Sequence, residues 1–457
     1  MIQPLRYGFA VLLVTLLTAC SGMRPWQNLP LSPDVALPAV RVAPDLDVSV
    51  ADGRSMVLAV TISGGGARAA AFGYGVLNAM GQIHLRWNGR DVTLLDELDV
   101  ISGISGGSII AAYYAAFGKK TFPAFEHDFL YQDFQDIFVR NMLLPSALFD
   151  LSSPWIGRTN LLARRLDELY RGKTFADLEV RPGQPLLLIS ATDLSLGSSF
   201  EFTREQFELI CSDLASVPLS FAVASSSAVP IALSPTTLRN YNDICPRPPL
   251  DLKSVAPTNY RVRLLRDNQQ SYLDATKRPY IHLVDGGISD NLGVRTLLEH
   301  SLAAGGIRSS VRRTSKSAIQ KLVIITVNAE RDPSERIDAS DKVPNTMQVV
   351  DALLFGTGAR ASQETLGLLT DTAQGWRNEL NHSVADGMDT FTQNAQIYVI
   401  KVNLRDAPEL LLRDALLQVP TAFSIPRSDV TRLIEAGRHT LLESPDFKAL
   451  LNSFDVE

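Results

Sequence analysis

Runs of apolar, largely β-branched residues recur along the chain and alternate with stretches of helical character. Such runs, bounded by turn signals, are typical of buried strands. The predicted core strands are 56–62, 98–101, 186–191, 281–284 and 322–328, with a late strand at 397–403. Helices are predicted over 69–80, over 108–117 and, as the last element, over 427–442 after Pro426. Strands that alternate with helices predict the α/β class, here a three-layer α/β/α sandwich with a mainly parallel central sheet.

Composition narrows the class of protein. The chain has 457 residues, 46% of them hydrophobic and 20% charged, which indicates a globular protein with a large core. The formal net charge of -6 argues against a nucleic-acid partner. No Cys/His spacing typical of a metal site occurs, and no cofactor is expected. Cys211 and Cys245 are either a disulfide pair, as an oxidising compartment would allow, or two free buried thiols.

The N-terminus has the pattern of a targeting segment. Arg6 precedes the apolar stretch 7–17, which is too short to span a membrane. Small residues then lead directly to Cys20, and this resembles the lipobox of bacterial lipoprotein signal peptides. The resemblance implies that Cys20 is lipidated and, because Ser21 follows it, that the protein resides at the outer membrane. The alternative is an ordinary secretory signal with a coincidental cysteine.

Two glycine-rich turns follow the first two predicted strands. They read Ser63-Gly64-Gly65-Gly66-Ala67-Arg68 and Gly103-Ile104-Ser105-Gly106-Gly107. In the second turn, glycines on both sides of Ser105 let the chain bend sharply between strand and helix, which is the nucleophile-elbow pattern. In the first turn, backbone N–H groups at a helix N-terminus are unshielded by side chains and therefore suit a negatively charged oxygen. The pair predicts a serine nucleophile beside an anion-binding loop.

Other interpretations of the two turns are weaker. The first turn is no phosphate loop, because G-x-x-x-x-G-K-[ST] is absent, and it is a poor dinucleotide fingerprint, because Ala69 stands where the third glycine belongs. Either turn alone is compatible with a purely structural bend. The strand before each turn and the helix after it favour the catalytic interpretation.

A serine nucleophile needs a base, and Asp285 is the better candidate. It ends the predicted strand 281–284 and precedes Gly286 and Gly287, which turn the chain. Open α/β sheets place their sites at the carboxyl ends of strands. Burial without a positive partner would raise the pKa of the carboxyl and make it a better proton acceptor. The six histidines lie in no comparable motif, and an Asp-Gly turn of purely structural role is the alternative for Asp285.

The chain resembles the patatin-like phospholipase family of serine acyl hydrolases. The resemblance covers roughly residues 55–300 and rests on four ordered blocks. These are Gly64-Gly65-Gly66-Ala67-Arg68, Gly103-Ile104-Ser105-Gly106-Gly107, Ala224-Ser225-Ser226-Ser227-Ala228-Val229-Pro230 and Asp285-Gly286-Gly287. The resemblance implies that Ser105 is the nucleophile and Asp285 the base of a Ser-Asp dyad. It also implies that Gly64, Gly65, Gly66 and Arg68 form the oxyanion loop, and that Gly103, Gly107, Gly286 and Gly287 shape the turns.

Two departures from the family pattern concern the oxyanion loop. Ser63 replaces the usual aspartate before the glycines, and Ala69 replaces the usual glycine after Arg68. Neither substitution removes a backbone N–H, so the loop is expected to keep its donors.

The expected organisation has four parts. They are a lipoprotein signal peptide at 1–19, a lipidated cysteine with a proline-rich extended tether at 20–54, the catalytic core at 55–300 and an extension at 301–457 that completes the same domain. Residues 237–280 are expected to form a surface insertion. The phenylalanine-rich stretch 122–149 is expected to be buried in the core, with contact to lipid as the alternative.

The resemblance implies hydrolysis of lipid or phospholipid carboxylic esters, of the phospholipase A or lysophospholipase type. The expected partners are therefore a lipid substrate and, through Cys20, a membrane. Two alternatives remain open. One is an α/β-hydrolase-type esterase whose base is His300, His382 or His439. The other is a lipoprotein of the cell envelope that has this scaffold but no activity.

Overall fold

The computed structural model describes residues 22–32, 37, 46–48, 55–179, 184–245, 260–313, 318–331, 338, 340–345, 348–349, 352, 357–382 and 390–454. Cys20 and the predicted signal peptide lie outside the described residues. No helix in the described part of the chain is both long enough and apolar enough to cross a membrane.

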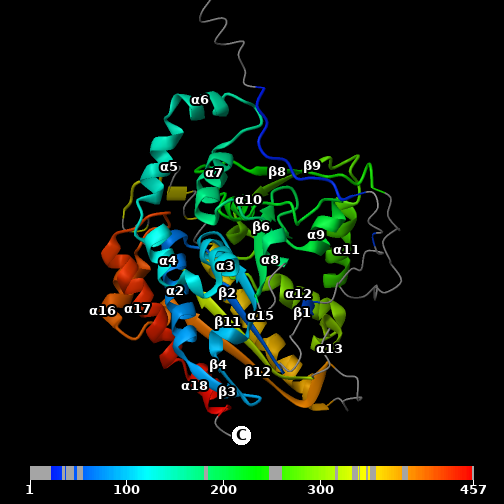
Figure 1. The fold of residues 1–457 in the computed structure, drawn as a ribbon, viewed down its shortest axis with the longest axis vertical. Helices are drawn as coiled ribbons and strands as arrows, with labels where there is room; N and C mark the ends of the chain where they lie inside the picture. Colours follow the sequence, from blue (N-terminus) through cyan, green and yellow to red (C-terminus); the bar gives the residue numbers. More distant parts are fainter. Residues whose placement is uncertain are drawn as a thin grey trace, which may run out of the picture.

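One eight-stranded sheet organises the molecule (Figure 1). Its strands are β2 (Met56–Ile62), β5 (Leu98–Gly103), β6 (Leu186–Asp193), β7 (Ser199–Glu201), β8 (Thr236–Arg239), β9 (Tyr280–Val284), β11 (Ile319–Asn328) and β12 (Phe391–Asn403). The order along the sheet is β12-β11-β2-β5-β6-β9-β8, with β7 paired to β6 beside this path. The pairs from β12 to β6 are parallel, whereas β9, β8 and β7 pair in antiparallel fashion. The predicted mainly parallel sheet is confirmed.

Helices cover both faces of this sheet. In β2, Met56, Leu58, Val60 and Ile62 belong to one hydrophobic core, whereas Val57 belongs to a second one. Alternate side chains of a strand point to opposite faces, so the two cores lie on opposite sides of the sheet. The larger core includes α2 (Gly66–Gln82), α3 (Gly106–Phe117), α10 (Leu219–Ser226) and α17 (Arg427–Glu443). The smaller core includes α12 (Arg295–Ala304) and α15 (Thr357–His382), and the result is the predicted α/β/α sandwich.

Shorter elements surround the sandwich. The other helices of the described chain are α4 (Thr121–Phe125), α5 (Phe134–Met142), α6 (Pro145–Leu151), α7 (Arg158–Tyr170), α8 (Ala176–Glu179), α9 (Arg204–Leu209), α11 (Tyr260–Tyr272), α13 (Ile307–Ser310), α16 (Leu410–Leu417) and α18 (Pro445–Asn452). Short 3-10 or π-helical turns occupy Leu94–Glu97, Gly118–Lys120, Glu126–Leu130, Gly286–Ile288 and Leu404–Asp406. The remaining strands form two small sheets: β3 (His84–Trp87) with β4 (Arg90–Thr93), and β1 (Leu46–Val48) with β10 (Val311–Arg313).

Close contact between α2 and α17 explains two helical glycines, and Figure 1 shows the two helices side by side. A Cβ atom at Gly75 would collide with the carbonyl oxygen of Ile434, and one at Gly437 would collide with that of Phe72. Glycine therefore lets the two backbones approach, although it weakens each helix slightly.

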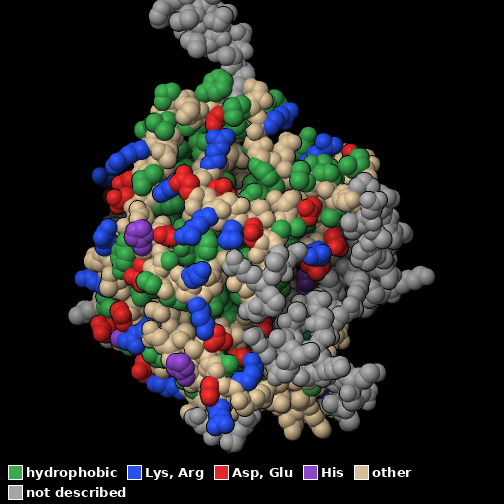
Figure 2. Space-filling view, in the orientation of Figure 1, with side chains coloured by type: hydrophobic (Ala, Val, Ile, Leu, Met, Phe, Trp, Pro, Cys, Tyr) green, Lys and Arg blue, Asp and Glu red, His purple; other side chains and the backbone are tan. Residues whose placement is uncertain are grey.

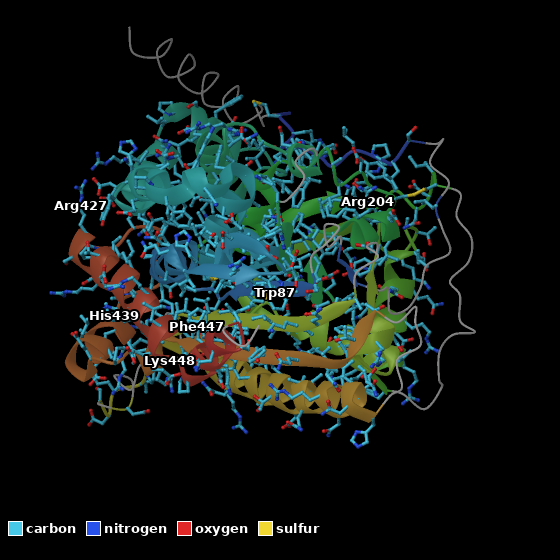
Figure 3. All side chains as sticks on the ribbon, turned by 60° about the horizontal axis from the view of Figure 1, so that its bottom comes forward. Trp87, Arg204, Arg427, His439, Phe447 and Lys448 are labelled. Atoms are coloured by element: carbon cyan, nitrogen blue, oxygen red, sulfur yellow. A yellow bond between two sulfur atoms is a disulfide. The ribbon has the colours of Figure 1, made fainter. Side chains whose placement is uncertain are left out.

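The elements differ from prediction in several places, and β12 begins at Phe391 instead of the predicted residue 397. The first helix begins at Gly66, three residues before the predicted start. Helix α17 is not the last helix, because Ser444 caps α18 by accepting a hydrogen bond from the Phe447 amide and Pro445 opens it. Both helices are seen in Figure 3, which labels Arg427 and His439 on α17 and Phe447 and Lys448 on α18. The expected surface insertion begins with β8, an edge strand of the central sheet.

Part of the predicted tether lies against the core. Asn28 is buried, and its amide hydrogen-bonds the Ser212 hydroxyl and the Arg239 backbone. The Trp26 ring packs on Phe221 with ring centroids 4.7 Å apart. These contacts hold the chain in an extended path across the molecule.

Of the two alternatives for the cysteines, the structure contains the disulfide. Cys211 and Cys245 are joined across a Cα–Cα distance of 6.2 Å. Disulfides are typical of proteins outside the reducing cytosol.

The phenylalanine-rich stretch divides into a buried and an exposed part. Phe125, Phe129, Phe134 and Phe138 are buried, as expected for a core segment. Phe149 is not, because about half of its side chain is exposed. The expectation of a core segment therefore holds for these four phenylalanines but not for Phe149.

Candidate active site

Ser105 lies at the tip of a sharp bend between β5 and α3. Its backbone has φ 48° and ψ -120°, a strained conformation for a residue with a side chain. A Cβ atom at Gly103 would contact the Gly107 carbonyl group, and one at Gly107 would collide with the carbonyl groups of Ile62 and Ser63. Gly103 therefore lets the bend close on the first turn of α3, and Gly107 lets it pack against the end of β2. This geometry is that of a nucleophile elbow, which presents the serine hydroxyl at the carboxyl edge of the sheet.

Ser226 supports this bend. Its hydroxyl accepts a hydrogen bond from the Ser105 amide at 2.8 Å and donates one to the Ser190 carbonyl at 2.7 Å. The hydroxyl thus links the elbow to β6, and all three groups are buried. A satisfied network of this kind holds a strained backbone in one conformation.

Asp285 reaches the same edge of the sheet from the opposite direction. Strand β9 runs antiparallel to β6, with Val284 opposite Thr192. The carboxyl end of β9 therefore turns back toward Ser190, whose carbonyl lies so close to Gly286 that no Cβ atom fits there. The Asp285 backbone is fixed on both sides, because its amide donates to the Ala228 carbonyl at 3.0 Å and its carbonyl accepts from the Thr192 hydroxyl at 2.8 Å.

The Asp285 carboxyl is buried beside Ser105. Burial raises its pKa to about 6, although hydrogen bonding by the Gly287 amide and the Ser105 hydroxyl opposes this shift. The Gly287 amide donates to Oδ1 at 2.8 Å. Oδ2 has no well-formed hydrogen bond to any described residue, although the Ser105 hydroxyl is close enough to influence the carboxyl pKa. Catalytic hydrogen bonds are often long in the absence of substrate.

The first glycine turn lies directly beside the elbow. A Cβ atom at Gly64 would lie 3.5 Å from the Ser105 Cβ, and one at Gly106 would collide with the Gly66 backbone. The N-termini of α2 and α3 therefore touch each other. Within the described part of the chain, the amides of Gly65 and Gly66 have no hydrogen-bond acceptor. They are available for a negatively charged oxygen, at a helix N-terminus that favours such an atom.

Two residues of the predicted oxyanion loop have other partners. The Gly64 amide donates to the carbonyl oxygen and to Oδ1 of Asn291, each at 3.2 Å, so it is not free. The Arg68 guanidinium is buried and donates to the Ala329 carbonyl at 2.7 Å and to the Val419 carbonyl. Arg68 thus fastens the turn to the C-terminal part of the chain, and burial lowers its pKa to about 9. These bonds favour a role for Arg68 in steadying the loop.

A pocket brings these groups together. Its lining includes Gly64, Gly65, Arg68, Ser105, Asp285 and Gly287, together with the apolar side chains of Val229, Pro230 and Ile288. All six histidines are described, and none lines the pocket. The described residues also contain no cluster of His, Cys, Asp or Glu suited to a metal ion.

Sequence reasoning assigned no role to Ser226 or Asn291. Asn291 accepts from the Gly64 amide and lies 3.3 Å from a Glu330 carboxylate oxygen through its Nδ2. Ser226 was part of a quoted sequence block, but a run of three serines does not indicate which hydroxyl faces the elbow. Ser226 and Asn291 are recognised only by their hydrogen-bond partners, Ser105 and Gly64, which lie 121 and 227 residues away in sequence.

Ser226→Ala is expected to lower kcat about tenfold or more and to destabilise the fold by about 1–3 kcal/mol, because the buried Ser105 amide loses its acceptor. Ser227→Ala is the matched control, since the Ser227 hydroxyl is buried but has no partner among the described residues. Ester hydrolysis and chemical denaturation measure the two effects. Equal behaviour of the two variants would show that Ser226 does not position Ser105.

Comparison with known proteins gives a family for this arrangement. The family model described as patatin-like phospholipase matches residues 60–298, which is more than half of the chain. None of the curated proteins compared with the chain matches it.

Several solved structures are similar. Human GIVD cytosolic phospholipase A2 is 13% identical, with a TM-score of 0.46, and the match covers 88% of this chain and 60% of that one. VipD from Legionella pneumophila is 12% identical, with a TM-score of 0.34 and coverage of 96% and 73%. The chain thus spans about three fifths of the human enzyme's length. The family match alone, over residues 60–298 that contain both Ser105 and Asp285, identifies the chain as a member of the patatin-like phospholipase family.

Proposed function

We propose that the chain is a serine acyl hydrolase that cleaves carboxylic esters of lipids or phospholipids, of the phospholipase A or lysophospholipase type. Family membership indicates a lipid hydrolase. The observation that carries the finer proposal is the meeting of three groups in one pocket: Ser105, Asp285 and Gly65 of the first glycine turn.

In the proposed reaction, Asp285 accepts the Ser105 proton while Ser105 Oγ attacks the ester carbonyl carbon. The negative charge that develops on the carbonyl oxygen is stabilised by the Gly65 and Gly66 amides. Collapse of the tetrahedral intermediate breaks the ester bond, and Asp285 returns the proton to the leaving alcohol. Asp285 then deprotonates a water molecule, whose oxygen attacks the acyl-enzyme carbonyl carbon. The bond to Ser105 Oγ breaks, Asp285 returns the proton to Oγ, and the carboxylic acid is released. No step needs a metal or a cofactor.

The carboxyl pKa of about 6 suits this role. An ordinary aspartate has a pKa near 3.9 and is a poor base at neutral pH, whereas a raised pKa improves proton transfer. At pH 7 the carboxyl is still mostly ionised, so it is in the form that accepts a proton. A histidine-based esterase finds no support, because no histidine lines the pocket.

A fluorophosphonate probe followed by peptide mapping tests the nucleophile. We expect covalent modification of Ser105 in the wild-type protein and no labelling of Ser105→Ala. Labelling at another residue would assign a different nucleophile. Absence of labelling in a folded protein would favour an envelope protein without activity.

We also propose that the mature chain is anchored through a lipidated Cys20 to the outer membrane of a bacterium. The support is the sequence before Cys20, together with a disulfide that suits an oxidising compartment. Incorporation of labelled palmitate in cells tests this proposal. We expect the wild-type protein to carry the label and Cys20→Ser to lack it. Retention of the label in that variant would remove the anchor from the proposal.

A further inference from the structure

An apolar surface lies on α5, α6 and the loop after them. Of the 18 large hydrophobic residues exposed in the described chain, six lie between residues 139 and 155. They are Val139, Leu143, Leu144, Leu148, Phe149 and Trp155, and we call them the α5–α6 tip. Leu143 is 69% exposed and Leu148 is 54% exposed. Figure 2 shows hydrophobic side chains gathered at the upper end of the molecule, where Figure 1 places α6. Exposed apolar side chains that cluster in this way mark an interaction site, whereas single exposed apolar residues need no explanation.

The other side of these helices is fastened to the protein. Phe134, Phe138 and Ala147 are buried in the larger core. The carboxylate of Asp150 is paired with Arg164 on α7. The two helices are therefore held in place by the core, and the apolar side chains of the tip point away from it.

The charge around the tip is positive. Arg140 lies within it, and Arg24 and Arg158 lie at its border, all three exposed. Helices α5 and α6 carry two acidic residues: Asp150 is buried and paired with Arg164, and Asp136, one turn before Arg140, is exposed. The three exposed arginines therefore outnumber the exposed acidic side chains of the two helices. Apolar side chains with a basic border are suited to the interface of a bilayer that contains anionic lipid.

The described chain begins at this surface. The Ser153 hydroxyl donates to the Met23 carbonyl at 2.7 Å, and the Arg24 guanidinium lies 3.5 Å from the centre of the Trp155 ring. Residues 1–21 precede this point, with the apolar stretch 7–17 and Cys20 among them. Cys20 is thus three residues from Met23, so a lipid attached to it would be delivered beside the tip.

A segment that lines the pocket is connected to the tip. Val229 and Pro230 line the pocket, and the next residue, Ile231, is 53% exposed. The Arg158 guanidinium, three residues after Trp155, donates to the Ile231 carbonyl at 2.5 Å. Arg158, at the border of the tip, is thus hydrogen-bonded to the segment that lines the pocket at Val229 and Pro230.

We propose that the α5–α6 tip is a bilayer-docking surface that inserts its apolar side chains into the interface of an anionic lipid membrane. The binding itself follows from exposure and charge, whereas its consequence for catalysis rests on the proposed lipid hydrolysis. Docking through the tip would bring a substrate that resides in the bilayer to the pocket without a separate carrier.

Quenching measures docking independently of activity. An environment-sensitive fluorophore is attached to the introduced thiol of the full-length Leu148→Cys variant. The labelled protein is then reconstituted into phosphatidylethanolamine vesicles with and without phosphatidylglycerol. Leu264→Cys on α11 is the matched control, because Leu264 is exposed to 45% but lies outside the tip. Peptide mapping verifies that the label is on the introduced thiol. We expect nitroxide-labelled lipid to quench the Leu148→Cys label at least about twice as strongly as the control label, and more strongly with phosphatidylglycerol present. Equal quenching of the two labels would overturn the proposal. This result is also expected if the tip binds a protein and not a membrane.

A second variant pair measures the consequence for catalysis. Leu148→Ser/Phe149→Ser is expected to lower activity on vesicles about tenfold or more, because two large apolar side chains no longer enter the interface. Activity on a soluble short-chain ester is expected to be unchanged. Tyr260→Ser/Leu264→Ser removes a similar apolar area from α11 and is expected to affect neither activity. If both substrates were affected equally, the tip would have no docking role. If the wild type cleaved neither substrate, the proposed function would fail while the quenching result would still decide docking.

Discussion

Asp285→Asn is expected to lower kcat/KM by about 10³-fold or more, because an amide cannot accept the Ser105 proton. The asparagine Oδ1 keeps the acceptor for the Gly287 amide, so the turn is expected to retain its geometry. Hydrolysis of a soluble ester at pH 7–8 provides the measurement. Full activity of Asp285→Asn, together with loss of activity on replacing a histidine, would contradict the dyad and favour a Ser-His-Asp triad.

The pH dependence of the wild-type protein follows from the same carboxyl. Its pKa of about 6 means that protonation below pH 6 removes the base, so kcat/KM is expected to fall about tenfold per pH unit there. The pKa is raised on folding, so the protonated carboxyl favours the native state. That contribution is complete below pH 4 and is lost as the pH rises through 6.

Stability provides a control for Asp285→Asn. Because asparagine carries no buried charge, this variant is expected to be more stable than the wild type above pH 6, by at most about 3 kcal/mol, with no such difference below pH 4. Thermal unfolding at several pH values measures this. If Asp285→Asn were instead less stable than the wild type at pH 8, its loss of activity could be explained by unfolding. The catalytic role of Asp285 would then be unsupported.

Gly106→Ala is expected to lower kcat/KM by about 10²–10³-fold, because its Cβ atom would collide with the Gly66 backbone and displace the proposed oxyanion donors. Overpacking of this kind also costs stability, about 1–3 kcal/mol. Gly375→Ala in α15 is the matched control, since a Cβ atom there meets nothing within 4 Å. The control is expected to keep its activity and to gain about 0.5–1 kcal/mol in stability. Wild-type activity of Gly106→Ala would show that the two helix N-termini need not touch for catalysis.

The parts of the site that were predictable come from local patterns. The apolar runs before Gly64 and Gly103 predict strands, and glycines around Ser105 predict a sharp bend, because only glycine permits such close backbone approach. Asn88 and Gly89, both with positive φ, form the two-residue turn between β3 and β4. Asn-Gly is a strong hairpin signal, so this pair of strands was also predictable, although it was not predicted.

Other features depend on contacts between distant segments. Nothing local specifies that β9 runs antiparallel to β6, yet this direction brings Asp285 back to the level of Ser105. The partners of the Gly64 amide and of Arg68 lie more than 200 residues away in sequence. The burial of these phenylalanines depends on distant segments, since Phe134 packs against Phe423 and Arg165 of α7. Periodicity alone therefore did not identify Phe149 as exposed.

The C-terminal part of the chain contributes to the site as well. Strands β11 and β12 belong to the central sheet, although the family model ends at residue 298. The Ala67 amide donates to the Ala422 carbonyl at 2.7 Å, and Thr421 lines the pocket. The glycine turn that supplies the proposed oxyanion donors is thus held in part by residues beyond the matched region.

Mass spectrometry of the lipids released from phospholipid vesicles is the most direct measurement of the central claim. The wild-type protein is expected to release free fatty acid and lysophospholipid, and Ser105→Ala, folded to the same extent, is expected to release neither. Equal release by the two proteins, or a folded wild-type protein that releases no fatty acid, would contradict the assignment of Ser105 as the nucleophile of a lipid acyl hydrolase.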